Sequence, residues 1–154
     1  MARPTGLWQQ LEEQVAAKVQ SLGLGLAGVD IQSVTGYNLQ GPYPRAVVAF
    51  AEARKQSYQV IYGIVREDTI VSFDITVICK AAGAPDVGRS GPAGAYRLLE
   101  EIRNGMSSFT PTLQNVQATF PVVWNFDVPE IVRDQTTYAM TSGYEIEIVL
   151  SFPC

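Results

Sequence analysis

The sequence predicts an α+β fold in which a mainly antiparallel sheet carries two amphipathic helices. Two segments place apolar residues at helical spacing, and most other apolar segments alternate with polar residues as half-buried strands do. The order along the chain is helix, strands, helix, strands, and the 154 residues contain no internal repeat and no long linker. We therefore expect residues 1–154 to form a single domain.

The first helix is predicted from Leu7 to Leu22. Its apolar stripe recurs every three or four residues and consists of Leu7, Leu11, Val15, Val19 and Leu22. A glycine-rich break follows at residues 23–28, and residues 29–34 then alternate as a short strand does. The chain is thus expected to open with a helix that docks by one face, followed by a strand.

Three further apolar segments predict the centre of the sheet. Residues 45–53 are almost entirely apolar, which indicates a strand that lies centrally in a sheet. Residues 58–66 and 70–80 follow, and we expect them to form an antiparallel hairpin that turns at Glu67, Asp68 and Thr69.

The second helix is predicted to begin with Ser90 as its N-cap and Pro92 in its first turn. It is expected to end near Asn104 and Gly105. Its apolar stripe is formed by Tyr96, Leu99, Ile102 and Met106. Glu100 and Arg103 are spaced to form an ion pair on its surface.

The last third of the chain is β-like but less regular. Val122, Trp124 and Phe126 alternate, although the segment at about 110–135 is interrupted by Pro111, Pro121 and Pro129 and is expected to be irregular. Residues 136–140 and 144–152 are predicted to pair through a turn at Ser142 and Gly143. Glu145 and Glu147 then share one face of the final strand and meet water or a wet cavity.

Composition disfavours several classes of function. The sequence has no histidine, and its cysteines, Cys79 and Cys154, lack the spacing of metal ligands, so we expect no metal, cofactor or catalytic centre. The net charge of -4 disfavours nucleic-acid recognition. No apolar run is long enough for a membrane span, and the first residues lack a signal-peptide core, so we expect a soluble protein that is not exported.

Two glycine-rich segments match or nearly match nucleotide-binding sequence motifs, but neither has the other features that such a site requires. Residues 23–28 read G-x-G-x-x-G, but they follow a helix and precede a strand, which is the wrong order for a dinucleotide site and suits a helix end. Residues 83–90 come within one residue of a phosphate loop, yet Arg89 replaces its lysine and Asp86 adds negative charge. We interpret them as a connecting loop, with Arg89 solvated or at an interface, and keep a nucleotide-binding enzyme as a remote alternative.

Four features together resemble a known family. They are the N-terminal amphipathic helix, a central hairpin that ends in residues 71–79, the stretch GAYRLLE at 94–100 that opens the second helix, and the closing strand YEIEI at 144–148. In this combination and order the chain is similar to the Mu-like phage tail protein family, of tail-terminator type. The resemblance implies a tail-terminator-like fold and a structural virion protein with no enzymatic activity.

The resemblance also implies partners and a location. Proteins of that family form a ring, typically of six subunits, that caps the tail tube, ends its polymerisation and offers a surface for joining the head. The implied partners are copies of the chain itself, the tail tube protein and a head–tail connector or neck protein, with DNA passing through the lumen without sequence-specific binding. The protein would be assembled in the host cytoplasm and reside in the virion tail near the neck.

Three residues are the sequence-based candidates for an interface or lumen: Arg89, Glu145 and Glu147. Besides the nucleotide-binding enzyme, two alternatives to the tail terminator stay open. One is another tail or head–tail component, such as a tube subunit or neck protein. The other is a peptide-binding module that uses a free sheet edge.

Overall fold

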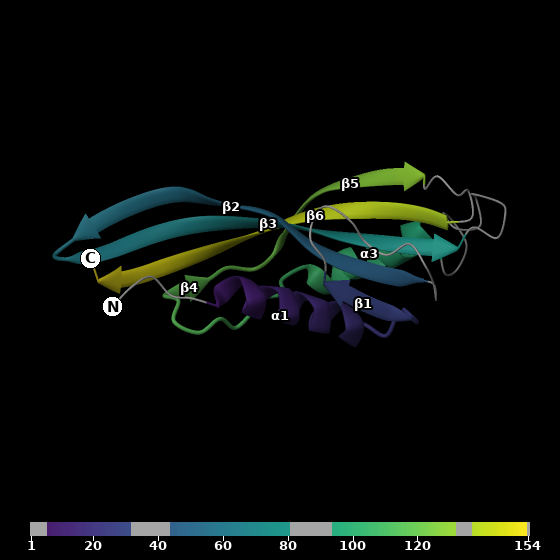
Figure 1. Cartoon of the computed structure of the whole chain (residues 1–154), viewed down its shortest axis with the longest axis horizontal. Helices are drawn as coiled ribbons and strands as arrows, with labels where there is room; N and C mark the ends of the chain where they lie inside the picture. The colour runs from purple at the N-terminus through teal and green to yellow at the C-terminus, as the bar shows by residue number, and fades with distance from the viewer. Residues whose placement is uncertain (1–5, 32–43, 81–93, 132–136, 154) are drawn as a thin grey trace.

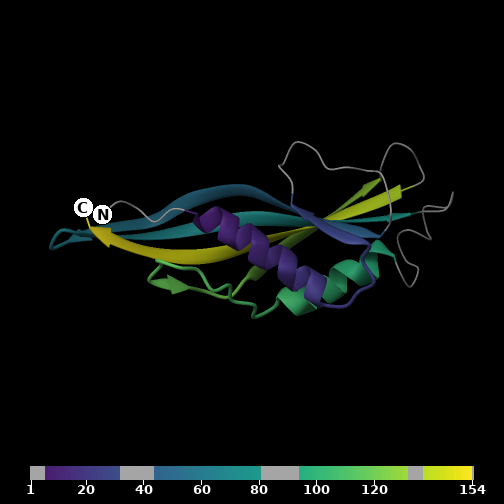
Figure 2. The same cartoon turned by 60° about the horizontal axis from the view of Figure 1, so that its bottom comes forward.

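The computed structural model describes residues 6–31, 44–80, 94–131 and 137–153. Within them the protein has the predicted α+β fold, in which a curled, mostly antiparallel sheet carries two helices on one face (Figures 1 and 2). The elements are α1 (Leu7–Ser21), β1 (Gly28–Ile31), β2 (Arg45–Ile61), β3 (Ile64–Lys80), α3 (Ala95–Met106), β4 (Ala118–Thr119), β5 (Val123–Ile131) and β6 (Thr137–Pro153).

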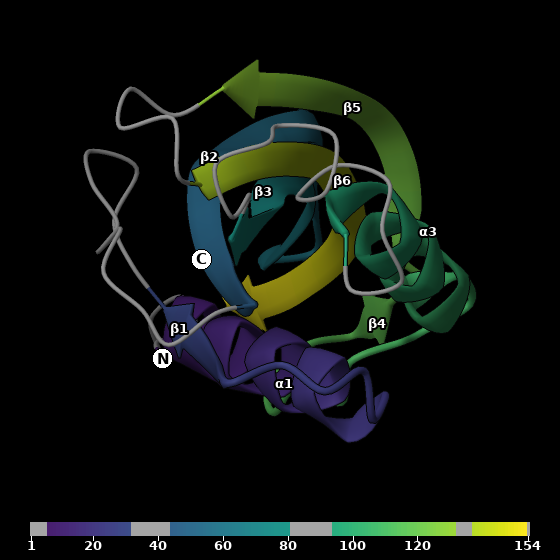
Figure 3. The ribbon, with the colours of Figure 1, turned by 90° about the vertical axis from the view of Figure 1, so that its right-hand side faces the viewer.

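Three long strands, β2, β3 and β6, form the frame of the six-stranded sheet. The strand order is β1-β2-β3-β6-β4, and β5 also pairs with β6. β1 runs parallel to β2, and every other pairing is antiparallel. Viewed along its long axis, the sheet curls into a half-barrel with α1 and α3 outside it (Figure 3).

Helix α1 forms as the apolar spacing predicts. Leu7, Leu11, Val15 and Val19 are buried against the sheet. The helix ends where Gly23 and Gly25 adopt φ of +66° and +74°, a left-handed conformation that glycine accepts without steric cost. The interpretation of residues 23–28 as a helix end and loop agrees with this geometry.

The core lies between the two helices and the sheet. Phe73, which is 0% exposed, occupies its centre, and its ring centroid lies 5.6 Å from that of Phe50 and 5.5 Å from that of Tyr144. The same face of β6 buries Ile146, Ile148 and Leu150, as the alternation predicts. Helix α1 packs mainly on β1 and β2, and helix α3 packs on β6 and β3.

The predicted hairpin turn at Glu67, Asp68 and Thr69 is wrong. β3 runs through these residues without a break, and the chain turns instead at Tyr62 and Gly63, which have φ of 51° and 78°. Positive φ at both central residues defines a type I′ turn, whose twist matches that of the flanking strands. Polar residues such as Glu67 and Thr69 usually indicate a turn, but here they are buried within the strand.

The predicted turn at Ser142 and Gly143 is also wrong. β6 passes through both residues, with Ser142 paired to Ile75 and Gly143 paired to Asp74. The glycine serves close packing, because a Cβ atom at position 143 would collide with the ring of Phe126, which lies across it. Gly143 therefore marks the place where the Phe126 side chain of β5 covers β6, and not the end of a strand.

Helix α3 differs from its prediction at both ends. It begins at Ala95 after Gly94, whereas Ser90 and Pro92 lie outside the described residues. It continues through Asn104 and Gly105 to Met106. Its buried stripe consists of Ala95, Leu98, Leu99, Ile102 and Met106, whereas Tyr96 is 39% exposed.

The segment at about 110–135, expected to be irregular, contains strands β4 and β5 in its described part. β5 pairs with the first part of β6, and β4 pairs with Val149 and Ile148 further along it. The preceding residues are attached to α1, because the Gln14 side chain donates to the Thr112 carbonyl at 2.6 Å and accepts from its N–H at 2.7 Å. The alternation at 122–126 also places Trp124 and Phe126 in half-exposed positions rather than in the core.

Candidate functional site

The distal part of the β2–β3 hairpin projects beyond the two helices (Figures 1 and 2). We call residues 51–64 the arm, because every one of them is exposed. Five large apolar side chains at its end are at least half exposed: Tyr58, Val60, Ile61, Tyr62 and Ile64. The strand register places Tyr58 and Val60 on one face of the hairpin and Ile61 and Ile64 on the other. Exposed apolar side chains gathered in this way are typical of a protein–protein contact.

One edge of the arm also has open backbone groups. β1 pairs with β2 only at residues 45–48. From Ala49 to Ile61 the outer edge of β2 has no strand partner among the described residues. Such an edge can accept a strand of another chain.

A second group of exposed apolar side chains lies on and beside β5. Val123, Phe126 and Val128 are 59%, 46% and 48% exposed, and Phe120 is 45% exposed. Their register with Glu145, Gly143 and Thr141 of β6 places the three β5 residues on the sheet face opposite the helices. The molecule therefore has two separate apolar surfaces, the arm and β5.

The sequence-predicted candidates Glu145 and Glu147 lie on this same face. Glu145 is partly neutralised, because Arg54 lies 3.4 Å from it and the side-chain amide of Asn125 donates to it at 2.6 Å. Glu147 lines a shallow cavity of about 200 Å³ together with Ile70 and Phe120. Arg89 lies outside the described residues.

The face opposite the helices carries more acidic than basic groups. The strand registers place six acidic residues and three basic residues there among the described side chains: Asp30, Glu52, Asp68, Asp74, Glu145 and Glu147 against Arg45, Arg54 and Arg66. The local charge is thus of the same sign as the net charge of -4.

A polar cluster joins α3, β5 and β6 on the helix side of the sheet. Arg103 pairs with Asp127, not with Glu100 as predicted, and its guanidinium lies 4.2 Å from the centroid of the Trp124 ring. Asp127 also accepts from the indole N–H of Trp124 at 2.9 Å and from the Ser142 hydroxyl. Cation–π stacking and charged hydrogen bonds together hold α3 against β5.

This cluster makes the stability of the fold dependent on pH. Burial alone raises the pKa of Asp127, but the hydrogen bonds from Ser142 and Trp124 and the charge of Arg103 outweigh it and hold the pKa below its ordinary value of 3.8. A lowered pKa in the folded state means that the carboxylate contributes stability above pH about 4, which is lost as the pH falls through the folded-state pKa.

We therefore expect Asp127→Asn to lower the free energy of unfolding at neutral pH by about 1–3 kcal/mol. The difference between the wild type and the variant should shrink when urea denaturation is repeated from pH about 6 to about 2. A difference that stays constant across this range would show that the carboxylate charge does not contribute.

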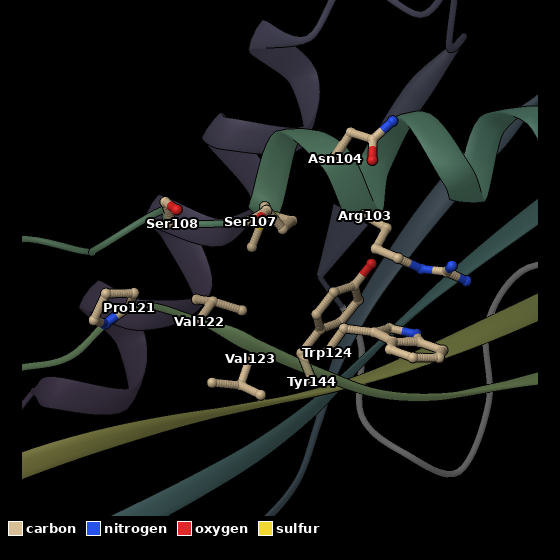
Figure 4. Close-up of a pocket in the computed structure, with 10 residues that line it drawn as sticks. Arg103, Asn104, Ser107, Ser108, Pro121, Val122, Val123, Trp124 and Tyr144 are labelled. Atoms are coloured by element: carbon tan, nitrogen blue, oxygen red, sulfur yellow. The ribbon is translucent and has the colours of Figure 1, made fainter.

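A cavity of about 430 Å³ opens beside this cluster, between the end of α3 and the beginning of β5 (Figure 4). Tyr144 rises from β6 toward α3 and forms one wall, and Val122 and Val123 lie across from Ser107. Its residues come from three distant parts of the sequence, so no local sequence signal could have identified it.

Two polar groups beside this cavity are buried from solvent. They are the hydroxyl of Tyr144, a residue that is 1% exposed, and the Nε–H of Arg103. Burial raises the pKa of Tyr144 to about 12, so its hydroxyl keeps its proton and remains a donor. Because neither atom is exposed, neither is available to bind another molecule.

The other chemical groups offer little for catalysis. No group of three or more histidine, cysteine, aspartate or glutamate residues gathers in the described ranges in a way that could hold a metal ion. Cys79 is buried, which raises the pKa of its thiol to about 12. Neither α1 nor α3 has the length and apolar character needed to cross a bilayer.

Comparison with solved structures reveals proteins of the same fold. A chain in a structure described as "Virion of native gene transfer agent (GTA) particle" superposes with a TM-score of 0.51 and 14% sequence identity, over 92% of this chain and 90% of that chain. A second solved chain, described only by a sequence identifier, has a TM-score of 0.50 and 15% identity, over 92% of both chains. No protein-family model matches the sequence, and no curated protein matches it significantly.

Proposed function

We propose that this protein is a structural component of a phage-like virion that assembles into a ring and caps the tail tube. The observation that carries the proposal is the arm, which exposes five large apolar side chains far from the core. Such a surface is costly for a monomer to leave in water and gains free energy when another chain covers it. The fold shared with a chain of a gene transfer agent virion supports a place in a particle of this kind.

The position of the two apolar surfaces favours a ring. The arm and β5 lie at different places along the molecule, so a contact between them joins unlike surfaces of two copies. Contacts of this head-to-tail type close into a ring when the rotation from one subunit to the next is a whole-number fraction of a full turn. By its resemblance to tail terminators, the ring is proposed to contain six subunits.

The acidic sheet face is proposed to line the lumen of the ring. Glu145 and Glu147 would then contribute to a surface that repels the phosphate backbone and lets DNA pass without binding. Arg89 is proposed to lie at an interface with a neighbouring subunit. The outer faces of the ring would bind the tail tube protein on one side and the head–tail connector or neck protein on the other.

In this proposal the protein has no catalytic role. Its function depends on surfaces that fit other proteins, and the virion tail near the neck is its proposed location. The lack of a metal cluster in the described residues and the buried, protonated thiol of Cys79 are compatible with such a role.

A tail tube subunit is the second candidate, and the open outer edge of β2 favours it. Further copies of the chain could pair with such an open edge one after another and so build a tube. Negative-stain imaging of the purified protein separates the two functions. Closed rings of uniform diameter are expected for a terminator, and filaments that lengthen with protein concentration would contradict it.

A further inference from the structure

The open edge of β2 is interrupted along most of its length. The register of β2 with β3 skips Ala51 and Gln56, so one extra residue breaks the ladder at each place, as in a β-bulge. The same stretch contains three charged residues: Glu52, Arg54 and Lys55. Bulges and charges are the features by which edge strands avoid pairing with another chain. Only residues 57–61, at the end of the strand, combine a regular register with the absence of charge.

The turn of the arm determines which backbone groups of residues 57–61 point outward. In a hairpin with a two-residue turn, the flanking pair, here Ile61 and Ile64, is a hydrogen-bonded pair. Because hydrogen-bonded and non-hydrogen-bonded pairs alternate along an antiparallel ladder, Tyr58 and Val60 direct their N–H and C=O groups away from β3. Both residues are exposed, and no described strand lies on this side of them. The segment can therefore pair with one further strand.

Strand β5 is the other long edge of the same sheet. It pairs with β6 on one side, and its outer side has no strand partner in the described ranges. Pro129 lacks an N–H and ends the part of β5 that can pair continuously. The remaining stretch, 123–128, contains the exposed apolar side chains of β5, and its one charged residue, Asp127, is already paired with Arg103. The two segments are thus similar in length and carry no unpaired charge.

We propose that residues 57–61 of one subunit pair with residues 123–128 of a second copy of the chain as antiparallel strands. The strands β2, β3, β6 and β5 lie side by side in this order and alternate in direction, so β2 of a second copy continues the sheet beyond β5 in the antiparallel sense. The outward N–H and C=O groups of Tyr58 and Val60 then bond to backbone groups of β5. The inference rests on the proposed self-assembly and identifies the strands that form the contact.

The side chains of the two segments are compatible across such a pairing. Tyr58 and Val60 lie on the helix side of the sheet, as Trp124 does. Ile61 lies on the opposite face, as Val123 and Phe126 do. Aromatic and β-branched side chains on one face of neighbouring strands stabilise their pairing. The contact therefore covers apolar side chains of both segments.

The shape of the sheet also favours this contact. A single chain forms a half-barrel, so a strand added at the β5 edge extends the same curl (Figure 3). Residues 57–61 pair with the start of β3, whereas residues 123–128 lie beside the part of β6 that pairs with the middle of β3. Successive copies are therefore staggered along the strands, and a stagger of this kind is required when a sheet closes into a barrel.

A pairing between two β2 edges is the competing contact. It would relate the two copies by a twofold axis and would leave the exposed apolar side chains of β5 in water. The pairing of β2 with β5 joins unlike edges, so each subunit uses both of its open edges when the ring closes.

The first test measures amide exchange with deuterium, residue by residue. In the monomer the N–H groups of Tyr58 and Val60 should exchange quickly, whereas that of Gln59, which bonds to β3, should exchange slowly. Assembly should slow the exchange of Tyr58 and Val60 by about tenfold or more. The amide of Ala51, at the first bulge, should exchange as it does in the monomer. Unchanged exchange at Tyr58 and Val60 in assembled protein would overturn the inference.

The second test removes one outward donor. Val60→Pro deletes an N–H that does not bond to β3, so the variant should unfold close to the wild-type temperature. The dissociation constant for assembly, measured by sedimentation, should rise about tenfold or more, because an acceptor on β5 loses its partner. Gln56→Pro is the matched control, because Gln56 is the extra residue of a bulge and lies outside the pairing segment. It should assemble as the wild type does, and equal assembly of both variants would contradict the proposed pairing.

The third test identifies the partner strand. A photo-reactive benzophenone side chain at position 58 should cross-link assembled protein to residues 123–128 of another copy. Mass spectrometry of mixed labelled and unlabelled subunits locates the link and shows that it joins two chains. The same group at position 31, on β1, should give no link to β5. Links from position 58 to residues 57–61 of another copy would show that two β2 edges pair and would overturn the inference.

The outcomes distinguish the inference from the proposed function. A wild type that forms closed rings without protection of Tyr58 and Val60 would contradict the strand pairing and leave the ring in place. A wild type that stays monomeric at all concentrations would contradict both. Protection of these two amides together with links to β5 would support both.

Discussion

Phe73→Ala is expected to lower the free energy of unfolding by about 3–5 kcal/mol, the usual loss when a large aromatic side chain is removed from a core. Phe73 is 0% exposed, and its ring lies between those of Phe50 and Tyr144 in the core. The cavity left behind cannot collapse easily, because its neighbours are held in three paired strands. A loss of this size is a large part of the roughly 5–15 kcal/mol that stabilises most domains.

Phe126→Ala is the matched control for this prediction. Phe126 is also a phenylalanine on the sheet, but it is 46% exposed and lies on the opposite face. Its removal should cost about 1 kcal/mol or less in urea denaturation of the monomer. Equal losses for the two variants would show that the core does not lie between the helices and β3.

The second large effect is expected on assembly. The triple variant Val60→Thr, Ile61→Thr and Ile64→Thr keeps β-branched side chains in the arm and removes much of its apolar surface. Each of the three is about half exposed, so covering the rest of it in an interface should contribute roughly 1 kcal/mol. The loss of all three is therefore about 3 kcal/mol, or on the order of 100-fold in the dissociation constant of each contact.

Sedimentation velocity and thermal unfolding should separate this effect from a loss of folding. The triple variant should sediment as a monomer at concentrations where the wild type assembles, with little change in its melting temperature. Ile31→Thr, at a position that is 41% exposed on β1 and distant from the arm, should assemble as the wild type does. Normal assembly of the triple variant would show that the arm is not an interface.

The spacing of apolar residues predicted helix α1 and its buried face, because helical periodicity depends only on residues close together in the chain. Leu7, Leu11, Val15 and Val19 are buried as expected. The two turns were misplaced for a different reason. Glycine at 143 serves close packing with Phe126, and a tyrosine occupies the position of the actual turn, where local propensity predicts asparagine or glycine.

The candidate site could be predicted only in part. Alternation along β6 placed Glu145 and Glu147 on one face, but their partner Arg54 lies 91 residues away in sequence from Glu145. The pairing of Arg103 with Asp127 likewise depends on how β5 lies beside α3. Ring contacts, long-range ion pairs and the cavity follow from tertiary packing, which spacing along the chain does not specify.

The most direct test of the proposed assembly is the mass of the purified protein by light scattering, over a wide range of protein concentration and salt. The proposal predicts one discrete oligomer whose mass stays fixed once formed, because a closed ring has no free interface, and which persists at high salt because apolar contacts hold it. A mass that grows continuously with concentration would indicate open polymerisation and favour a tube subunit. A strict monomer under all conditions would contradict self-assembly through the arm.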